Sequence, residues 1–185
     1  MPHNHPSSRL RLTKPIVLVG MMGVGKTSVG KRLAQRLRLP FVDSDHEIEA
    51  AAGLTIPEIF DKYGEPYFRD GERRVLARLL DGKPCVIATG GGAFMQAETR
   101  DLIKTGSHSV WIDADLETLV ERVGRRDTRP LLIGKDPRVV LGDLLAVRGP
   151  VYAEAEHHVQ SDNVPHEVMV DRIIAALSPQ QKPIS

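Results

Sequence analysis

Cysteine is almost absent from the chain, and aromatic residues are scarce. Among 185 residues there is one cysteine, and phenylalanine, tryptophan and tyrosine together make up 4%. A single cysteine excludes an internal disulfide and suits a reducing compartment, so we expect a cytoplasmic protein. Because Cys85 begins the apolar run CVIA, we expect a small buried hydrophobic side chain there rather than a catalytic thiol.

Long apolar runs and an excess of charge of one sign are also missing. No stretch approaches the roughly 18 apolar residues that a membrane-spanning helix needs. The formal net charge of +1 argues against a surface that binds nucleic acid. With 41% hydrophobic and 26% charged residues, the composition is that of an ordinary globular protein. We therefore expect no membrane and no nucleic acid among its partners.

The length predicts one domain, which we place at residues 14–178. The leader at 1–13, MPHNHPSSRLRLT, lacks the apolar segment of a secretory signal. Its arginines and serines leave an organelle-targeting segment open, although a disordered leader is the favoured interpretation. Residues 179–185 are expected to form a flexible tail.

Short apolar runs alternate with helical periodicity along this domain. The expected strands are 16–20, 40–43, 84–89, 108–113 and a weaker 157–161. The expected helices cover 26–39, a segment starting at the capping box of Ser44, 55–60, 66–81, 98–106, 115–123, 137–155 with an interruption near Gly149-Pro150, and 165–177. This alternation predicts an α/β fold with a parallel sheet covered on both faces. Ligands should then bind at the loops after residues 20, 43, 89 and 113, beyond the carboxyl ends of the strands.

A glycine-rich loop follows the first expected strand. Its sequence GMMGVGKT, residues 20–27, has the spacing G-x-x-x-x-G-K-[ST] between an expected strand and an expected helix. The glycines let successive N–H groups point at one anion, and the helix N-terminus adds partial positive charge there. Lys26 can reach the β- and γ-phosphates, and Thr27 can ligate magnesium. This predicts a nucleoside triphosphate site. A chance turn and a dinucleotide fingerprint, which Ser28 disrupts, are weaker alternatives.

Two acids and three glycines end the next strands. Asp43 and Asp45 are two positions apart, so in an extended segment both side chains point the same way. One carboxylate can hold hydrated magnesium and the other can accept a proton from a hydroxyl nucleophile; a helix cap with a solvated acid is the alternative. The run at 90–92 leaves backbone N–H groups open to a ligand, although it could be only a flexible turn.

Arginines supply the remaining candidates. Arg69, in YFRDGE, and Arg148, in VRGPVY, are natural bidentate partners for a carboxylate, although each alone could be a surface ion pair. The stretch ERVGRRDTRPLL concentrates arginines at 122, 125, 126 and 129 beside an apolar PLL, which is typical of a mobile lid as well as of a solvated face. Arg129 is the best candidate for stabilising transition-state charge. The histidines show no metal-site spacing, and the adjacent His157 and His158 are interpreted as structural or exposed.

Taken in order, these motifs resemble the shikimate kinase family from about residue 14 to 178. The matching stretches are GMMGVGKTSVG, FVDSDHEIE, IFDKYGEPYFRDGE, ATGGGA, RPLL and RGPVYAEAE. The resemblance implies a three-layer P-loop kinase fold, with five parallel strands in the order 2-3-1-4-5 and a mobile lid at about 122–136. It also implies an enzyme that uses ATP and Mg²⁺ to phosphorylate the 3-hydroxyl of shikimate, in chorismate and aromatic amino-acid biosynthesis.

The loop pattern and the resemblance together assign roles. The expected catalytic residues are Lys26, Asp45 and Arg129. The expected ATP-binding residues are Gly23, Val24, Gly25, Lys26, Thr27, Ser28, Arg122 and Arg129. The expected shikimate-binding residues are Asp45, Phe60, Phe68, Arg69, Gly91 and Arg148, and the expected magnesium ligands are Thr27 and Asp43.

Within these sets the resemblance gives each side chain a task. Asp45 would grip the shikimate hydroxyls and act as candidate base, and Asp43 would hold the metal through water. Arg69 and Arg148 would clamp the carboxylate, with pocket walls from the two phenylalanines. Arg122 would lie along the adenine. Residues 161–170 are only loosely similar, so no adenine contact is predicted there.

Two other functions compete with this hypothesis. A gluconate kinase would share the phosphate loop but not the ordered Phe-Arg, triple-glycine and Arg-Pro-Leu-Leu set. A nucleotide-sensing module would bind ATP without turnover and would not need Lys26, Asp45 and Arg129 together. Whichever function applies, we expect the protein to be a monomer.

Overall fold

The structure is a computed structural model that describes residues 10–125 and 132–179. Five strands form one sheet in the order β2-β3-β1-β4-β5, and every neighbouring pair is parallel. The strands are β1 (Ile16–Val19), β2 (Phe41–Asp43), β3 (Val86–Ala88), β4 (His108–Asp113) and β5 (His157–Gln160). The predicted fold class and strand order are confirmed.

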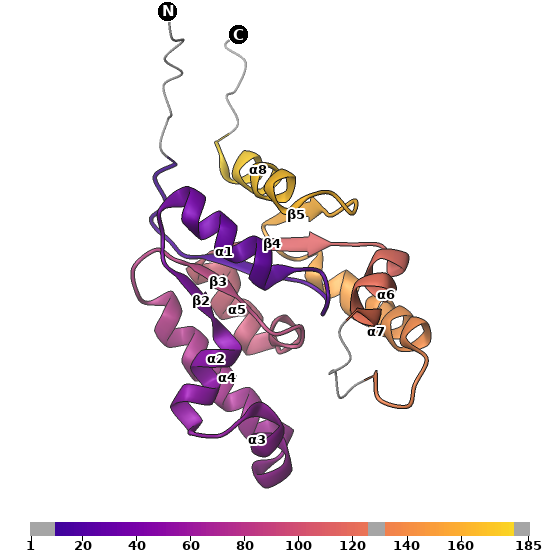
Figure 1. Ribbon diagram of the computed structural model, residues 1–185. Helices are drawn as coiled ribbons and strands as arrows, with labels where there is room; N and C mark the ends of the chain where they lie inside the picture. Colours follow the sequence, from indigo (N-terminus) through magenta and orange to yellow (C-terminus); the bar gives the residue numbers. More distant parts are fainter. Residues whose placement is uncertain (1–9, 126–131, 180–185) are drawn as a thin grey trace, which may run out of the picture.

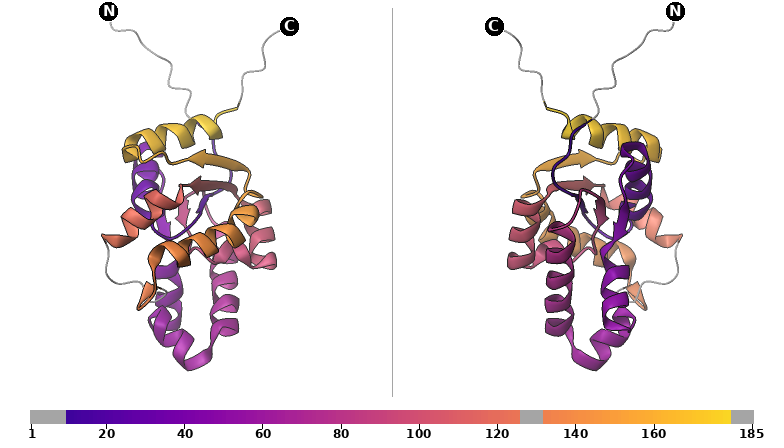
Figure 2. Two further views of the ribbon diagram at one scale, coloured as in Figure 1. Left: turned by 90° about the vertical axis from the view of Figure 1, so that its right-hand side faces the viewer. Right: turned by 90° about the vertical axis from the view of Figure 1, so that its left-hand side faces the viewer.

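Helices cover both faces of this sheet (Figure 1). They are α1 (Lys26–Leu37), α2 (Ser44–Ala52), α3 (Ile56–Tyr63), α4 (Glu65–Leu80), α5 (Ala97–Gly106), α6 (Leu116–Gly124), α7 (Pro137–Tyr152) and α8 (His166–Leu177), with a 3₁₀ turn η1 at Ala93–Met95. Figure 2 shows α1 and α5 on opposite sides of the sheet, and α2, α3 and α4 extending away from α8 as a helical arm.

The central strand forms the middle of the core. All four residues of β1 are fully buried, as expected for a strand with helices on both faces. Cys85 is buried in the same core, which confirms the expectation from its apolar run, and burial raises the pKa of its thiol. Within the described residues, none of the helices has both the length and the apolar character to cross a membrane.

The helix after β2 starts at Ser44 as expected, but the expected capping role of Ser44 and the expected interruption near Pro150 were wrong. The N-cap of α2 is Asp43, whose Oδ1 accepts from the N–H groups of Asp45 at 2.9 Å and His46 at 3.4 Å. Ser44 is the first helical residue, and its buried hydroxyl has no hydrogen-bond partner among the described residues. The interruption near Pro150 is also absent, because α7 continues to Tyr152. A proline this close to a helix end removes only one helical hydrogen bond.

Several expectations fall on residues outside the described ranges. These are Arg126, Arg129, Pro130 and Leu131 of the expected lid, most of the leader and most of the tail. Arg122 lies in the last turns of α6, which ends at Gly124, and Arg125 follows it directly.

Candidate active site

A cleft of about 470 Å³ lies at the carboxyl ends of β1, β2 and β3. The glycine-rich loop at residues 20–27, called the phosphate loop below, forms one wall of the cleft together with the start of α1. The lining residues on this wall are Gly23, Gly25 and residues 26–28. Asp43, Asp45 and the turn after β3 form the opposite wall. The loops after residues 20, 43 and 89 therefore meet in one place, as the parallel topology predicted, whereas the loop directly after residue 113 contributes none of the described lining residues.

The phosphate loop depends on glycine at particular positions. Gly23 and Gly25 have φ values of +79° and +93°, in the left-handed region that favours glycine. A β-carbon at Gly23 would also lie 2.9 Å from Val123 Cγ2 of α6. Val24 between them is buried, and its carbonyl accepts a hydrogen bond from Arg122 Nη1 at 2.9 Å. Arg122 thus holds the loop backbone as well as lining the cleft.

Charged and polar side chains of the loop face the acids at the end of β2. Lys26 Nζ donates to the carbonyl oxygens of Gly20 at 2.5 Å and Met21 at 3.1 Å. Thr27 Oγ1 donates to Asp43 Oδ2 at 3.4 Å. A hydroxyl and a carboxylate oxygen this close are hard donors of the kind that Mg²⁺ prefers.

The carboxyl group of Asp45 is less acidic than an ordinary aspartic acid. Its pKa is raised above 3.8, chiefly by burial and further by the neighbouring charge of Asp43, while the Lys26 ammonium opposes the shift. A carboxylate with a raised pKa is a better proton acceptor than a solvated one. The environment of Asp45 is therefore suited to a base close to the phosphate loop.

The three glycines after β3 make room for three of the predicted acceptor-binding side chains. A β-carbon at Gly90 would lie 3.0 Å from Asp45 Oδ1. At Gly91 it would lie 3.0 Å from Arg148 Nη1, and at Gly92 only 2.5 Å from Arg69 Nη2. The turn thus gathers one carboxylate and two guanidinium groups from α2, α4 and α7. This close approach explains why glycine occurs three times in succession.

Two buried groups fix this arrangement, and sequence reasoning missed both. Glu72, 1% exposed, accepts from Arg69 Nη1 at 2.9 Å, and burial raises the pKa of Glu72 although Arg69 lowers it. Tyr152 is fully buried, and its hydroxyl donates to the Gly91 carbonyl at 2.5 Å. Burial also raises the pKa of the Tyr152 phenol. A buried charged or phenolic side chain leaves no spacing signal in a sequence, since its burial is set by distant elements.

The two phenylalanines lie beside Arg69 rather than in the main cleft. Their ring centroids are 4.7 Å apart, and the Arg69 guanidinium lies 5.1 Å from the centroid of Phe68. Among the described residues, Phe68 lines a second hollow of about 330 Å³ and neither ring lines the cleft. The role of Phe60 and Phe68 as pocket walls stays a prediction.

His166 and Arg125 line the cleft without having been assigned to it. His166 is the first residue of α8, which follows β5, so the rule that placed other loops at the site also applies to this one. Burial lowers the pKa of His166, and the cations Arg32 and Arg122 lower it further. A neutral imidazole at this position could contact a nucleotide base without adding charge.

Replacing Gly92 with alanine should displace Arg69 without unfolding the chain. The new β-carbon would meet the end of a flexible side chain rather than backbone, so the guanidinium moves instead of the turn. We expect the KM for the acceptor to rise about tenfold with the KM for nucleotide unchanged. Gly71→Ala is the matched control, because nothing lies within 4 Å of a β-carbon there. Equal acceptor KM values in both variants would contradict the assignment of Arg69 to the acceptor.

The glycine-rich loop between β1 and α1, with a carboxylate and two guanidinium groups gathered at the turn after β3, is the arrangement of a P-loop kinase for a small anionic acceptor. Arg69 and Arg148 pack against that turn and are not among the described residues that line the cleft. The model of the shikimate kinase family matches residues 22–178. The chain belongs to that family.

Individual relatives agree with this assignment. A shikimate kinase of Caulobacter vibrioides is 61% identical over 164 residues, covering 89% of this chain and 82% of the relative. A shikimate kinase of Rhodopseudomonas palustris is 56% identical, covering 89% and 81%. The structure of the Acinetobacter baumannii shikimate kinase in complex with shikimate has a TM-score of 0.84 at 41% identity, covering 91% and 95%. A gluconokinase of Sinorhizobium meliloti, at 21% identity and a TM-score of 0.57, shares only the fold.

Proposed function

We propose that the chain transfers the γ-phosphoryl group of ATP to the 3-hydroxyl of shikimate, giving shikimate 3-phosphate and ADP. This reaction belongs to chorismate and aromatic amino-acid biosynthesis. The observation that carries the proposal is the triple-glycine turn, against which Asp45, Arg148 and Arg69 all pack. An acceptor with a carboxylate and several hydroxyls needs both kinds of group, because guanidinium binds carboxylate in a bidentate manner and a carboxylate accepts from hydroxyls.

The phosphate loop supplies the donor half of the reaction. Its N–H groups and Lys26 would hold the β- and γ-phosphates, and Arg122 would keep the loop in shape while contacting the nucleotide. Thr27 and Asp43 would hold Mg²⁺, with Asp43 acting through water; their oxygen donors suit this ion. When bound, the ion would help to neutralise the negative charge of the phosphates. Arg129 is proposed to add a further positive charge.

The acceptor half depends on positioning more than on covalent chemistry. Arg69 and Arg148 would hold the carboxylate at one end of the ring, with the Gly91 N–H close by. Asp45 would then accept a hydrogen bond from the attacking hydroxyl and take up its proton as the phosphoryl group transfers. Its raised pKa supports that role.

The proposal extends to the protein as a whole. We propose that residues 14–178 form the kinase domain, with about 122–136 as a lid, 1–13 as a leader and 179–185 as a tail. We propose a cytoplasmic monomer with ATP and shikimate as its small-molecule substrates. The lone cysteine supports a reducing compartment.

An assay of ADP release with ATP and Mg²⁺ tests the proposal directly. Shikimate, gluconate and no acceptor are compared at equal concentrations. We expect release with shikimate alone, and we expect EDTA to abolish it because the γ-phosphate charge is then not neutralised. Release with gluconate instead would keep the phosphate loop but reject the acceptor site. ATP binding without release in any arm would favour a nucleotide-sensing module.

A further inference from the structure

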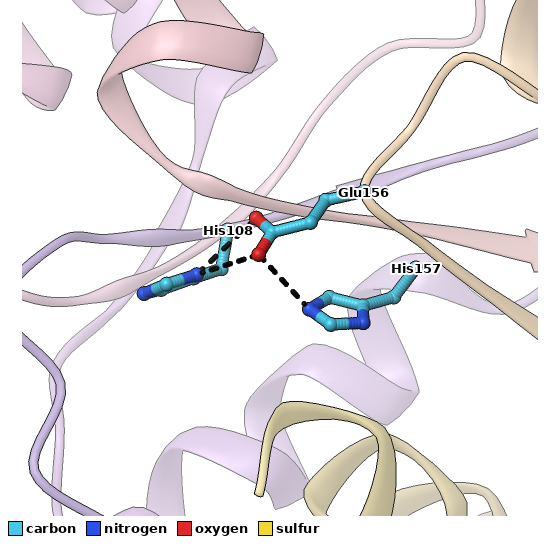
Figure 3. Close-up of side chains that lie close together, drawn as sticks. All are labelled: His108, Glu156 and His157. Carbon is cyan, nitrogen blue, oxygen red and sulfur yellow. Dashed lines mark hydrogen bonds and ion pairs between the residues drawn. The ribbon is translucent and has the colours of Figure 1, made fainter. Parts of the chain in front are cut away.

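A group of possible metal ligands lies away from the cleft, where β4 and β5 begin (Figure 3). His108, Glu156 and His157 each offer one ligand atom, and these atoms all lie within 4.8 Å of one another. The site is at the amino-terminal edge of the sheet, whereas the cleft is at the carboxyl-terminal edge. The reaction proposed above therefore makes no use of these side chains.

The strand register explains why residues 48 positions apart meet. On β5, His157 is the register partner of Val110 on β4. His108 precedes Val110 by two positions, so its side chain leaves the same face of the sheet. Glu156 is fixed between them because its N–H donates to the buried Ser109 Oγ at 2.8 Å.

The next histidine points away from this group. His158 stacks on Trp111, with ring centroids 4.2 Å apart, and its Nε2 lies 2.9 Å from Asp113 Oδ2. The side chains of His157 and His158 therefore leave the strand on opposite faces. The sequence gives no spacing signal for the group of His108, Glu156 and His157, because His108 comes from β4 and the other two lie at the start of β5.

The distances suit a small tetrahedral cation. Glu156 Oε1 lies 3.4 Å from His108 Nδ1 and 3.4 Å from His157 Nε2. Ligands bound to Zn²⁺ at about 2.0–2.1 Å in tetrahedral geometry are separated by roughly 3.3 Å. The carboxylate has already drawn both imidazole nitrogens to this spacing, so little movement is needed to admit an ion among them.

We propose that His108, Glu156 and His157 bind one Zn²⁺ ion, with water as the fourth ligand. Two imidazole nitrogens and one carboxylate suit zinc, whereas Mg²⁺ and Ca²⁺ prefer oxygen donors throughout. The side chains are 28%, 48% and 22% exposed, so solvent can deliver the ion and supply the water. The bound ion joins the start of β4 to the start of the edge strand β5. Its effect is on the stability of that strand pair and not on phosphoryl transfer.

Calorimetric titration of the full chain with zinc chloride tests the site. The protein is first treated with EDTA and then kept in excess Mg²⁺, which occupies the oxygen donors of the cleft. Every protein in the titration carries His3→Ala and His5→Ala, because the imidazoles of these two residues can themselves bind Zn²⁺. We expect one Zn²⁺ per chain, a raised Tm on binding and unchanged ADP release. Glu156→Gln and His157→Gln should each weaken binding at least about tenfold.

His158→Gln is the matched control, because it removes an adjacent imidazole from the other face of the strand. Retention of zinc affinity in this variant, together with loss in the other two, supports the site. Cobalt substitution adds a readout of geometry, since a four-coordinate ion gives intense visible absorption. No binding would show that Glu156 only pairs with the two histidines, and equal affinity in all variants would place the ion elsewhere. Either result overturns the proposal while leaving the kinase reaction untouched.

Discussion

Replacing Asp45 with asparagine is expected to lower kcat about a thousandfold, because the attacking hydroxyl loses its proton acceptor. Asparagine keeps the shape of the side chain and can still contact a hydroxyl, so the KM for shikimate should change much less than kcat. Asp43 remains in place to cap α2 and to contact Thr27, so nucleotide binding should be retained. Steady-state kinetics with each substrate varied in turn measures all of these parameters.

The matched control for this variant is Glu49→Gln. Glu49 lies one turn further along α2, and its charge contributes to the raised pKa of Asp45. The control removes one negative charge from the same helix while leaving the proposed base intact, so kcat should stay within about twofold. If Asp45→Asn also retained kcat within about threefold, the residue would have no part in the chemistry.

The raised pKa of Asp45 also has a consequence for stability. Its folded-state pKa lies above the value of 3.8 that applies to an ordinary aspartic acid, so the folded chain binds more protons than the unfolded chain between these values. The charged carboxyl therefore destabilises the fold as pH rises through its folded-state pKa, and this penalty is absent below about pH 3.8. Asp45→Asn should accordingly raise the free energy of unfolding at pH 7, and the gain should shrink toward pH 4. Denaturant unfolding at the two pH values checks this.

Features with local spacing could be predicted from the sequence. The phosphate loop has a fixed pattern between a strand and a helix, and the alternation of elements gave the parallel sheet. Because all parallel strands end at the same edge of the sheet, the sequence alone predicts that the loops after residues 20, 43 and 89 meet. The strand order came from the family resemblance, since periodicity alone does not order strands.

Features that depend on distant packing could not be predicted. Whether Asp43 or Ser44 caps α2 is decided by the backbone turn at the end of β2, because both residue types can accept from a helix N-terminus. The burial of Glu72 follows from how α4 packs and not from its neighbours in the chain. The triple glycine was interpreted as leaving space for a ligand. The space beside each of these glycines is also occupied by an arginine or aspartate side chain.

Arg69→Ala is expected to lower kcat/KM for shikimate about a hundredfold, with the KM for ATP within about twofold of the parent. The acceptor carboxylate loses one of its two guanidinium partners, whereas the phosphate loop is formed by other elements. The change should also destabilise the fold by about 2 kcal/mol, because Glu72 loses its charged partner while remaining buried. This loss should be smaller at acidic pH, where Glu72 becomes protonated. Kinetics and unfolding at two pH values separate the two effects.

Two further variants decide whether Arg69 acts on the acceptor or only on Glu72. Arg73→Ala removes a guanidinium four residues later on the same helix, where Arg73 pairs with Asp70 at 2.9 Å. The KM values for ATP and for shikimate should both be unchanged in this variant. Arg69→Lys keeps a positive charge near Glu72 but cannot form a bidentate contact with a carboxylate. It should therefore recover most of the stability while recovering little of kcat/KM. If Lys restored activity and stability together, Arg69 would be a partner of the buried carboxylate alone, and the acceptor would depend on Arg148 for its carboxylate.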